Sequence, residues 1–131
     1  SEFNASEEES LNLFQIWIFP HRQGLKPRYD QKKFEAETGK PTLLVSSDGR
    51  DGSLSINQDA FISRISLEAG SRLDYKLYSE GNGLFIMVIE GKARISGETL
   101  GKRDALTIKR ADEFTVEAQE QLDVLILEVP V

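Results

Sequence analysis

The sequence predicts an all-β fold, a sandwich or barrel of short strands. Apolar segments of strand length recur every ~8–12 residues, the spacing typical of such folds. Glycine and aspartate mark the turns between them, as in Asp48-Gly49 and Asp51-Gly52. No segment has the apolar spacing of a helix longer than two turns. The 131 residues are enough for one domain with a core of its own.

The first apolar segment is Leu11–Pro20, "LNLFQIWIFP". It predicts a strand whose two alternating sets of side chains are both largely apolar, so both of its faces need cover. Pro20 ends the strand because proline cannot donate to a β-ladder. A long, polar, basic connection follows at His21–Lys40, with a short helix expected at Gln31–Glu37.

The centre of the chain is Gly70–Gly97, which predicts strand, loop, strand, tight turn and strand. Its apolar run Leu84–Ile89 has the length of a strand buried on both faces. Gly91 then allows a tight turn, because glycine accepts the positive φ that such turns need. Glu98–Gly101 is expected as a further turn. Other strands are predicted at Thr42–Ser46, Leu54–Asp59, Ala60–Leu67, Asp104–Ile108, Phe114–Ala118 and Leu122–Val129.

Charge and composition exclude several classes of function. The net charge is −6, whereas nucleic-acid binding needs a basic surface. No apolar run approaches the ~18–20 residues of a membrane span. The chain has no cysteine, which excludes disulfides, zinc-thiolate sites and a cysteine nucleophile. These features predict a cytoplasmic protein that binds neither nucleic acid nor membrane.

Residues that could carry catalysis or bind a metal are scarce. The single histidine, His21, lies in the polar connection and has no rigid context for a catalytic triad. One imidazole cannot build a multi-histidine metal site. Asp48, Asp51 and Asp59 are too sparse for a calcium loop. We therefore expect no catalytic residue and no barrel metal in this chain.

The barrel interior remains as a candidate site. Strand alternation places Asp74, Lys76 and Tyr78 opposite Leu77. Lys76 and Tyr78 could bind a small acid or a phenol, or they could pair with Glu90 or other acids in a satisfied polar interior. The expected members of this interior pocket are Lys76, Tyr78, Phe114, Arg64 and Glu90.

Two motifs carry a resemblance to a known family. Gly70, positions 76 and 78, and Gly91 are spaced as in the first cupin motif, and "RDALTIKRADEFTVEA" resembles the second. The segments "FQIWIFP", "PRYDQKKFEA", "SSDGRDGSLSINQDA" and "LILEVPV" resemble, in order, the second half of a pirin-like bicupin related to quercetin 2,3-dioxygenases. The resemblance implies a cupin fold, a double-stranded β-helix or jelly-roll-like barrel.

The resemblance also implies where iron would bind. Such proteins have an iron-binding N-terminal cupin and a C-terminal cupin that has lost its metal. Lys76, Tyr78 and Phe114 stand at the positions of the motif histidines and cannot replace them. "SEFN" resembles the segment that supplies the last iron ligands of the first cupin, which makes Glu2 a possible orphan ligand. Ser1–Phe3 equally fits a cloning scar.

The expected organisation follows from this resemblance. Residues 1–20 would be continuous with, or swapped from, an absent N-terminal cupin, residues 21–41 a basic linker, and residues 42–131 the C-terminal barrel. An uncovered strand at Leu11–Ile18 would associate with its copy, so a homodimer is expected.

Several functions remain open at this point. The first is a metal-free, non-catalytic module that has a structural role or binds a small molecule or a protein. The second is part of a quercetin 2,3-dioxygenase-type iron oxidoreductase whose Fe(II) lies in the missing N-terminal cupin. A metal-independent activity of Lys76 and Tyr78 is a third. A fourth is a protein-interaction module using the basic link Arg22–Lys40, since the family is associated with transcription-factor partners in eukaryotes.

Overall fold

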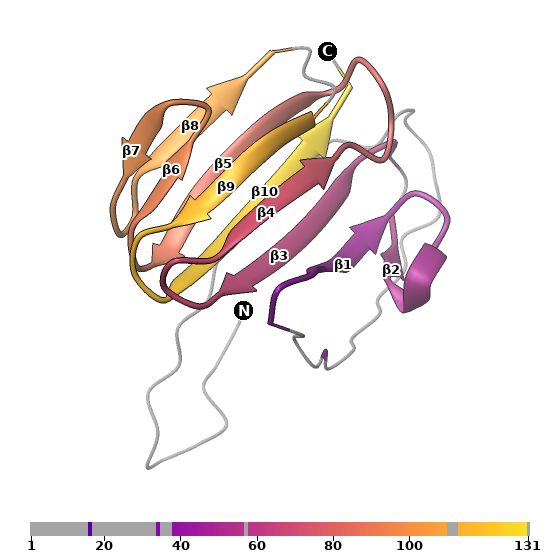
Figure 1. Ribbon diagram of the computed structural model, residues 1–131. Coiled ribbons are helices and arrows are strands. Elements are labelled where there is room, and N and C mark those ends of the chain that lie inside the picture. Colours follow the sequence, from indigo (N-terminus) through magenta and orange to yellow (C-terminus); the bar gives the residue numbers. More distant parts are fainter. Residues whose placement is uncertain (1–15, 17–33, 35–37, 57, 110–112, 131) are drawn as a thin grey trace.

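Two β-sheets packed face to face make up the part of the chain that the computed structural model describes, residues 16, 34, 38–56, 58–109 and 113–130 (Figure 1). The larger sheet has the strand order β2-β1-β3-β10-β5-β8 and the smaller one β4-β9-β6-β7. The strands of the larger sheet are β1 (Pro41–Ser46), β2 (Leu54–Ser55), β3 (Phe61–Leu67), β5 (Gly83–Glu90), β8 (Ala105–Ile108) and β10 (Leu122–Val129). Those of the smaller sheet are β4 (Arg72–Lys76), β6 (Ala93–Ile95), β7 (Glu98–Leu100) and β9 (Glu113–Ala118).

From β3 to β10 the chain passes repeatedly between the two sheets, as the jelly-roll prediction requires, and only β6 and β7 are consecutive strands of the same sheet. β3 and β5 lie in the larger sheet, whereas β4, which connects them in sequence, lies in the smaller one. All paired strands are antiparallel except β1 and the two-residue β2. Helical structure in the described part is limited to a 3-10 turn at Arg50–Gly52. The all-β prediction is confirmed, and no helix among the described residues has the length and apolarity to cross a membrane.

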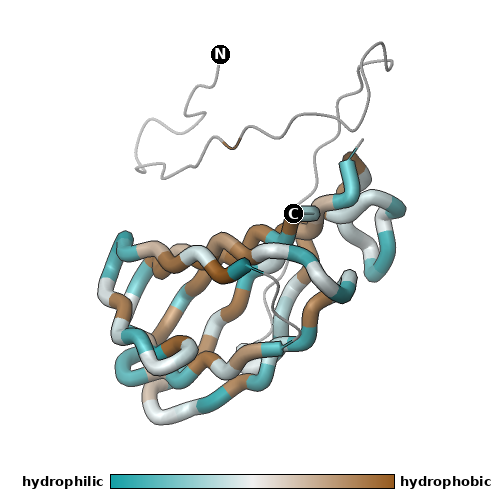
Figure 2. The backbone as a smooth tube through the Cα atoms, turned by 90° about the horizontal axis from the view of Figure 1, so that it is seen from above, coloured by the Kyte–Doolittle hydropathy of each residue, from teal (hydrophilic) through white to brown (hydrophobic). Residues whose placement is uncertain are grey.

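The core lies between the two sheets and is built from the inward side chains of both. In Figure 2 the hydrophobic segments alternate with hydrophilic ones along the strands, as expected when one face of each sheet is buried. The fully buried aliphatic side chains of this core include Ile65, Ile86, Val88, Val124 and Ile126 from the larger sheet and Ile95 and Val116 from the smaller one.

The prediction that Leu84–Ile89 is buried on both faces is wrong. Leu84, Ile86 and Val88 point into the core, but Phe85 is 40% exposed and Met87 is only half-buried. The reason is that β5 is a central strand of a sheet whose second face is not covered by the smaller sheet. An apolar run alone cannot distinguish this arrangement from full burial.

The tight turn at Gly91 is confirmed. Gly91 has φ 92°, and a Cβ atom there would lie 2.1 Å from the carbonyl oxygen of Gln121. Only glycine fits this place, because both the backbone conformation and the approach of the neighbouring turn exclude a side chain.

Two local predictions need correction. Glu98–Leu100 is strand β7 rather than a turn, and the chain reverses one step earlier, at Ser96 and Gly97, both with positive φ. The predicted strand Leu54–Asp59 is reduced to Leu54–Ser55.

The N-terminal predictions fall largely outside the described residues. Of the predicted strand Leu11–Pro20 only Ile16 is described, and of the predicted helix Gln31–Glu37 only Phe34. Thr38 forms a bridge to Ser66, and the Gly39 amide donates to the Ser66 carbonyl. Contacts with the barrel therefore begin before residue 42, while the domain boundaries as a whole stay a prediction.

Candidate functional site

The most unusual group of the described interior is the carboxylate of Glu128. It lies on the last strand, β10, on the same face as Val124 and Ile126, and is fully buried. A carboxylate is very rarely buried in this way unless its charge is compensated.

Four donors compensate this charge. The Tyr75 hydroxyl and the Tyr78 amide donate to Oε2, each at 3.1 Å. The Ser79 amide donates to Oε1 at 2.8 Å, and the Asn82 side-chain amide donates to the same oxygen at 3.2 Å. Each carboxylate oxygen therefore accepts two hydrogen bonds, and the loop between β4 and β5 is tied to the C-terminal strand.

A row of aromatic rings lies beside Glu128 and fills this end of the barrel. Phe61 and Tyr78 stack at 5.0 Å between ring centroids, and Tyr75 packs on Phe114 at 4.9 Å. Tyr75 and Tyr78 meet edge to face at 6.4 Å and join the two pairs. Burial, with Glu128 nearby, raises the pKa of Tyr75 far above its ordinary value, so its hydroxyl remains a donor. Burial also raises the pKa of Tyr78.

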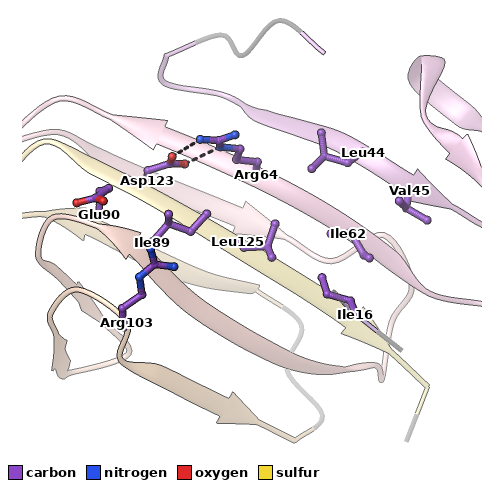
Figure 3. A pocket seen from close by; sticks show the side chains of 10 residues that line it. All are labelled: Ile16, Leu44, Val45, Ile62, Arg64, Ile89, Glu90, Arg103, Asp123 and Leu125. Carbon is purple, nitrogen blue, oxygen red and sulfur yellow. Dashed lines mark hydrogen bonds and ion pairs between the residues drawn. The ribbon is translucent and has the colours of Figure 1, made fainter. Parts of the chain in front are cut away.

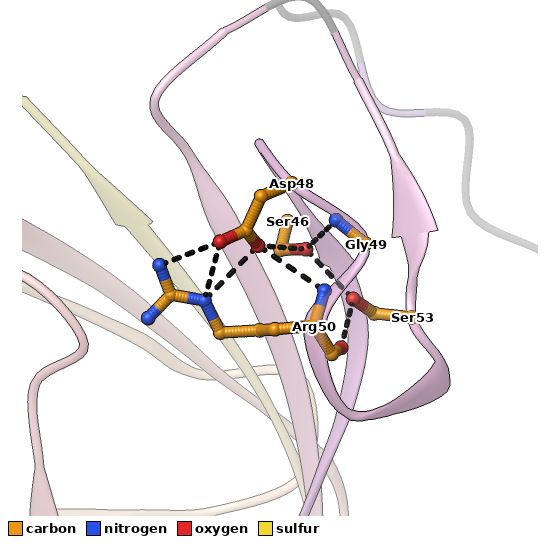
Figure 4. A network of polar contacts seen from close by, with 5 residues as sticks. All are labelled: Ser46, Asp48, Gly49, Arg50 and Ser53. Atoms are coloured by element: carbon orange, nitrogen blue, oxygen red, sulfur yellow. Dashed lines mark hydrogen bonds and ion pairs between the residues drawn. The ribbon is translucent and has the colours of Figure 1, made fainter.

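A second polar network orders the turn between β1 and β2 (Figure 4). Asp48 accepts hydrogen bonds from the Arg50 guanidinium at 3.0–3.1 Å and from the Arg50 amide at 3.1 Å. These bonds lower the pKa of Asp48 to about 2. Ser46 Oγ accepts the Gly49 amide at 2.8 Å and lies 2.7 Å from Ser53 Oγ. The turn holds the Arg50 guanidinium 5.1 Å from the centroid of the Phe61 ring.

A cavity of about 350 Å³ lies between these two networks, and we name it the mouth pocket. Polar side chains from several segments meet there around the edges of Phe61 and Tyr78. Its lining consists of Ser47, Arg50, Asp59, Phe61, Tyr78, Ser79, Asn82 and Pro130.

The structure does not bring together the five residues predicted for the interior pocket. Tyr78 lines the mouth pocket, and Phe114 is buried in the core. Lys76 is exposed, because the inward position of β4 is Tyr75, opposite Phe114, and the neighbouring positions point outward. Arg64 and Glu90 lie on the far side of the larger sheet, where they line a groove.

A polar interior with a paired acid exists, and Tyr78 belongs to it through its backbone amide, but its other members are not the predicted ones. Glu128 replaces Glu90 as the acid and Tyr75 replaces Lys76 as its partner. Tyr78 faces the interior because β4 ends at Lys76, beyond which strict alternation no longer holds. The signal that could have identified Glu128 was available in the alternation Val124, Ile126, Glu128, which places a charge on an inward face.

Comparison with known proteins identifies the barrel. Residues 43–129 match the model of the quercetinase C-terminal cupin domain. The chain belongs to this family. The resemblance to pirin-like proteins and the cupin fold are thereby confirmed.

Relatives of this cupin domain are similar along nearly the whole chain. Quercetin 2,3-dioxygenase of Escherichia coli K12 is 35% identical over 130 residues, which are 99% of this chain and 55% of that protein. A pirin-like protein of Caulobacter vibrioides is 31% identical over 132 residues, 98% of this chain and 56% of that protein. The chain spans about half the length of the curated relatives it matches.

A solved structure supports the same assignment. The bacterial pirin YhhW from Escherichia coli, in complex with nickel(II), superposes with a TM-score of 0.80 at 29% identity. The match covers 87% of this chain and 48% of that one. The described strands therefore have the arrangement of a pirin-type cupin.

The described residues of this cupin domain do not fit a metal site. Within the described part of the chain, no three His, Cys, Asp or Glu side chains form a group that could hold an ion. Lys76 and Phe114 offer no lone pair suited to iron at the motif positions, and both oxygens of Glu128 already accept hydrogen bonds. Glu2 lies outside the described residues.

Proposed function

We propose that this chain is a non-catalytic cupin domain whose barrel holds no metal and which serves a pirin-like protein as a structural or binding module. The observation that carries the proposal is the Glu128 cluster, in which a carboxylate with four donors and a row of aromatic rings occupies the end of the barrel.

The energetics of Glu128 support this role. A metal ion would have to displace the Tyr75 hydroxyl and the loop amides from the carboxylate, and it would gain a single ligand in return. Affinity for iron requires several preplaced ligands. The cluster instead stabilises the loop that closes the barrel.

The chemistry of the complete protein is the second candidate. We propose that the domain accompanies an N-terminal cupin which holds Fe(II), in an oxidoreductase of the quercetin 2,3-dioxygenase type. The similarity to quercetin 2,3-dioxygenase of Escherichia coli, of which this chain matches 55%, supports this reading. We also expect the protein to be cytoplasmic.

Calorimetry and oxygen uptake test the first proposal. Fe(II), and Ni(II) as a redox-inert substitute, are titrated into the purified, untagged chain under nitrogen, and oxygen consumption is then followed with quercetin. We expect no saturable heat and no uptake above the rate of free metal. Saturable binding of one ion per chain together with quercetin-dependent uptake would reject a non-catalytic domain.

The mouth pocket favours small-molecule binding by this module. Both of its walls are held by internal hydrogen bonds, one set by Glu128 and the other by Asp48. We propose that it accepts a small phenol or a small acid. Phenol and benzoate can be titrated into the protein and their binding followed by NMR. We expect Arg50→Gln to weaken the binding of benzoate more than the binding of phenol. Equal, unsaturable shifts throughout the molecule would argue against a pocket ligand.

We also propose a homodimer formed through Leu11–Ile18. Support comes from the apolar character of this segment and from Ile16, which lines a groove on the larger sheet. Sedimentation of the untagged chain at micromolar concentration tests it, and a single species of 14.7 kDa would contradict it.

A further inference from the structure

Ser63 is the one polar side chain on the inward face of strand β3, between Phe61 and Ile65. Its neighbours in sequence, Ile62 and Arg64, lie on the opposite side of the sheet, where both line a groove (Figure 3). Because side chains alternate along a strand, Ser63 points into the barrel. It is fully buried there, and its Oγ forms no hydrogen bond with any described residue.

At the positions that pair with Ser63, the neighbouring strands offer no polar side chain. These positions are Leu43 on β1 and Ile126 on β10, both buried and apolar. A buried hydroxyl without a hydrogen bond costs stability, and native proteins nearly always satisfy such a group through protein atoms or ordered water. The partner of Ser63 therefore has to lie in the interior that Ser63 faces.

The Glu128 cluster supplies polar groups close to Ser63. In the ladder between β3 and β10, Phe61 pairs with Glu128, which makes Ser63 and Glu128 diagonal neighbours on the inward face. The Tyr75 hydroxyl donates to Glu128 at 3.1 Å and so lies in the same part of the barrel. Burial raises the pKa of Tyr75 and of Tyr78, and the nearby Ser63 hydroxyl opposes both shifts, which places the three hydroxyls close together.

These three hydroxyls have the hydrogen-bonding capacity to hold a water molecule. Tyr75 uses its one proton on Glu128 and keeps its oxygen lone pairs as acceptors. Ser63 and Tyr78 can each donate, and burial keeps Tyr78 protonated by raising its pKa. A buried water makes about three hydrogen bonds and commonly bridges polar groups that do not bond to each other directly. Serine is also the smallest side chain in the inward row of β3, so it leaves more room in front of it than its neighbours do.

We propose that one water molecule binds inside the barrel between the hydroxyls of Ser63, Tyr75 and Tyr78. The water donates to the Tyr75 oxygen and accepts from Ser63 and from Tyr78. It joins β3 to the cluster that holds the loop between β4 and β5. It also fixes the side chain of Tyr78, which lines the mouth pocket and whose backbone amide already donates to Glu128.

The sign of a stability change tests this water site. Ser63→Ala removes the hydroxyl, so a bound water would lose one of its three partners, and the urea midpoint of unfolding should fall. A Ser63 hydroxyl that was simply unpaired would give the opposite result, because its removal relieves a buried unsatisfied group. Ser66→Ala, on the same strand but on its outward face, is the control and should change the midpoint less.

Oxygen-17 relaxation dispersion measures the site directly, because it counts the water molecules that stay bound for longer than the protein takes to rotate. We expect one such molecule fewer per chain in Ser63→Val, which removes the hydroxyl and fills the space in front of it. An equal number of long-lived water molecules, or a midpoint in Ser63→Ala that is unchanged or higher, would overturn the site. Circular dichroism confirms that the variants are folded, and the Ser63→Ala midpoint decides if Ser63→Val does not fold. None of these results bears on the metal-free barrel, which the calorimetric titration tests.

Discussion

At Glu128, four hydrogen bonds satisfy a carboxyl group that is buried inside the barrel. Glu128→Gln preserves the shape but places an NH2 group where an acceptor stood, so donors at one oxygen lose their partner. We expect the free energy of unfolding to fall by about 2–4 kcal/mol, since unsatisfied buried donors to a charged group cost this much. Urea titration measures it. Glu120→Gln, at an exposed position, is the control and should change the free energy of unfolding little. If both variants were equally stable, the stabilising role of the Glu128 hydrogen bonds would be contradicted.

The Tyr75 hydroxyl allows a prediction about pH. Its pKa is raised in the folded state above the ordinary value of 10.0, so folding favours the protonated form. The stabilisation is complete below pH 10 and is lost as the pH rises beyond it. We expect the free energy of unfolding to decline above pH 10, and less steeply in Tyr75→Phe. Unfolding curves recorded at several pH values measure this decline. If the free energy of unfolding of the two proteins fell in parallel above pH 10, the assignment to Tyr75 would be contradicted.

At the residue scale, the sequence predicted the kind of interior but only one of its members, Tyr78. It predicted a polar interior in which an acid is paired, and it placed Tyr78 there. It failed at Lys76 and Tyr75 because alternation gives two faces without saying which one is inside. A charged residue on an apolar strand, such as Glu128, was the better guide, since burial of a carboxylate demands partners.

The turn at Gly91 leaves no room for a side chain. Gly91→Ala would place Cβ 2.1 Å from the Gln121 carbonyl oxygen at a positive φ, whereas Gly97→Ala, also at positive φ, meets nothing within 4 Å. We expect Gly97→Ala to cost about 1 kcal/mol, from backbone strain alone. Gly91→Ala should cost at least about 2 kcal/mol more, since backbone must shift. Thermal unfolding of the two variants measures how much stability each loses. Similar losses would contradict the expectation that the contact at Gly91 adds to the cost.

The β1–β2 turn depends on the ionised form of Asp48. Its pKa is lowered from 3.8 to about 2, chiefly by the hydrogen bond from Arg50, so its contribution is present above pH 3.8 and is lost as the pH falls through about 2. We expect Asp48→Asn to melt at a lower temperature than the unmodified chain at neutral pH. The difference in melting temperature between the two proteins should become smaller near pH 2, because Asp48 is then largely protonated. A difference that persists unchanged into acid would rule out a charge effect.

At the element scale, alternation and turn residues predicted most strands of the barrel. Confirmed examples are Thr42–Ser46 and Leu122–Val129, which agree with β1 and β10 almost to the residue. The three-residue β7 was missed because Glu98–Leu100 has no apolar pattern of its own and pairs only through β6. The half-covered β5 was misjudged because its outer side chains are as apolar as its inner ones.

For the molecule as a whole, the resemblance to pirin-like cupins predicted the fold and the family that the comparisons confirm. It did not predict that Phe85 on β5 would be exposed, because strand patterns do not reveal which neighbours a sheet lacks. Glu2 and most of the basic link Arg22–Lys40 fall outside the described residues, and the roles expected of both stay predictions.

We propose that the Glu128 cluster leaves no metal site in this barrel. Elemental mass spectrometry of the untagged chain, after incubation with Fe(II) under nitrogen and extensive dialysis, measures the retained metal per chain. We expect only a trace of iron, identical in the unmodified chain and in Glu128→Gln. One retained ion per chain that disappears in Glu128→Gln would contradict it.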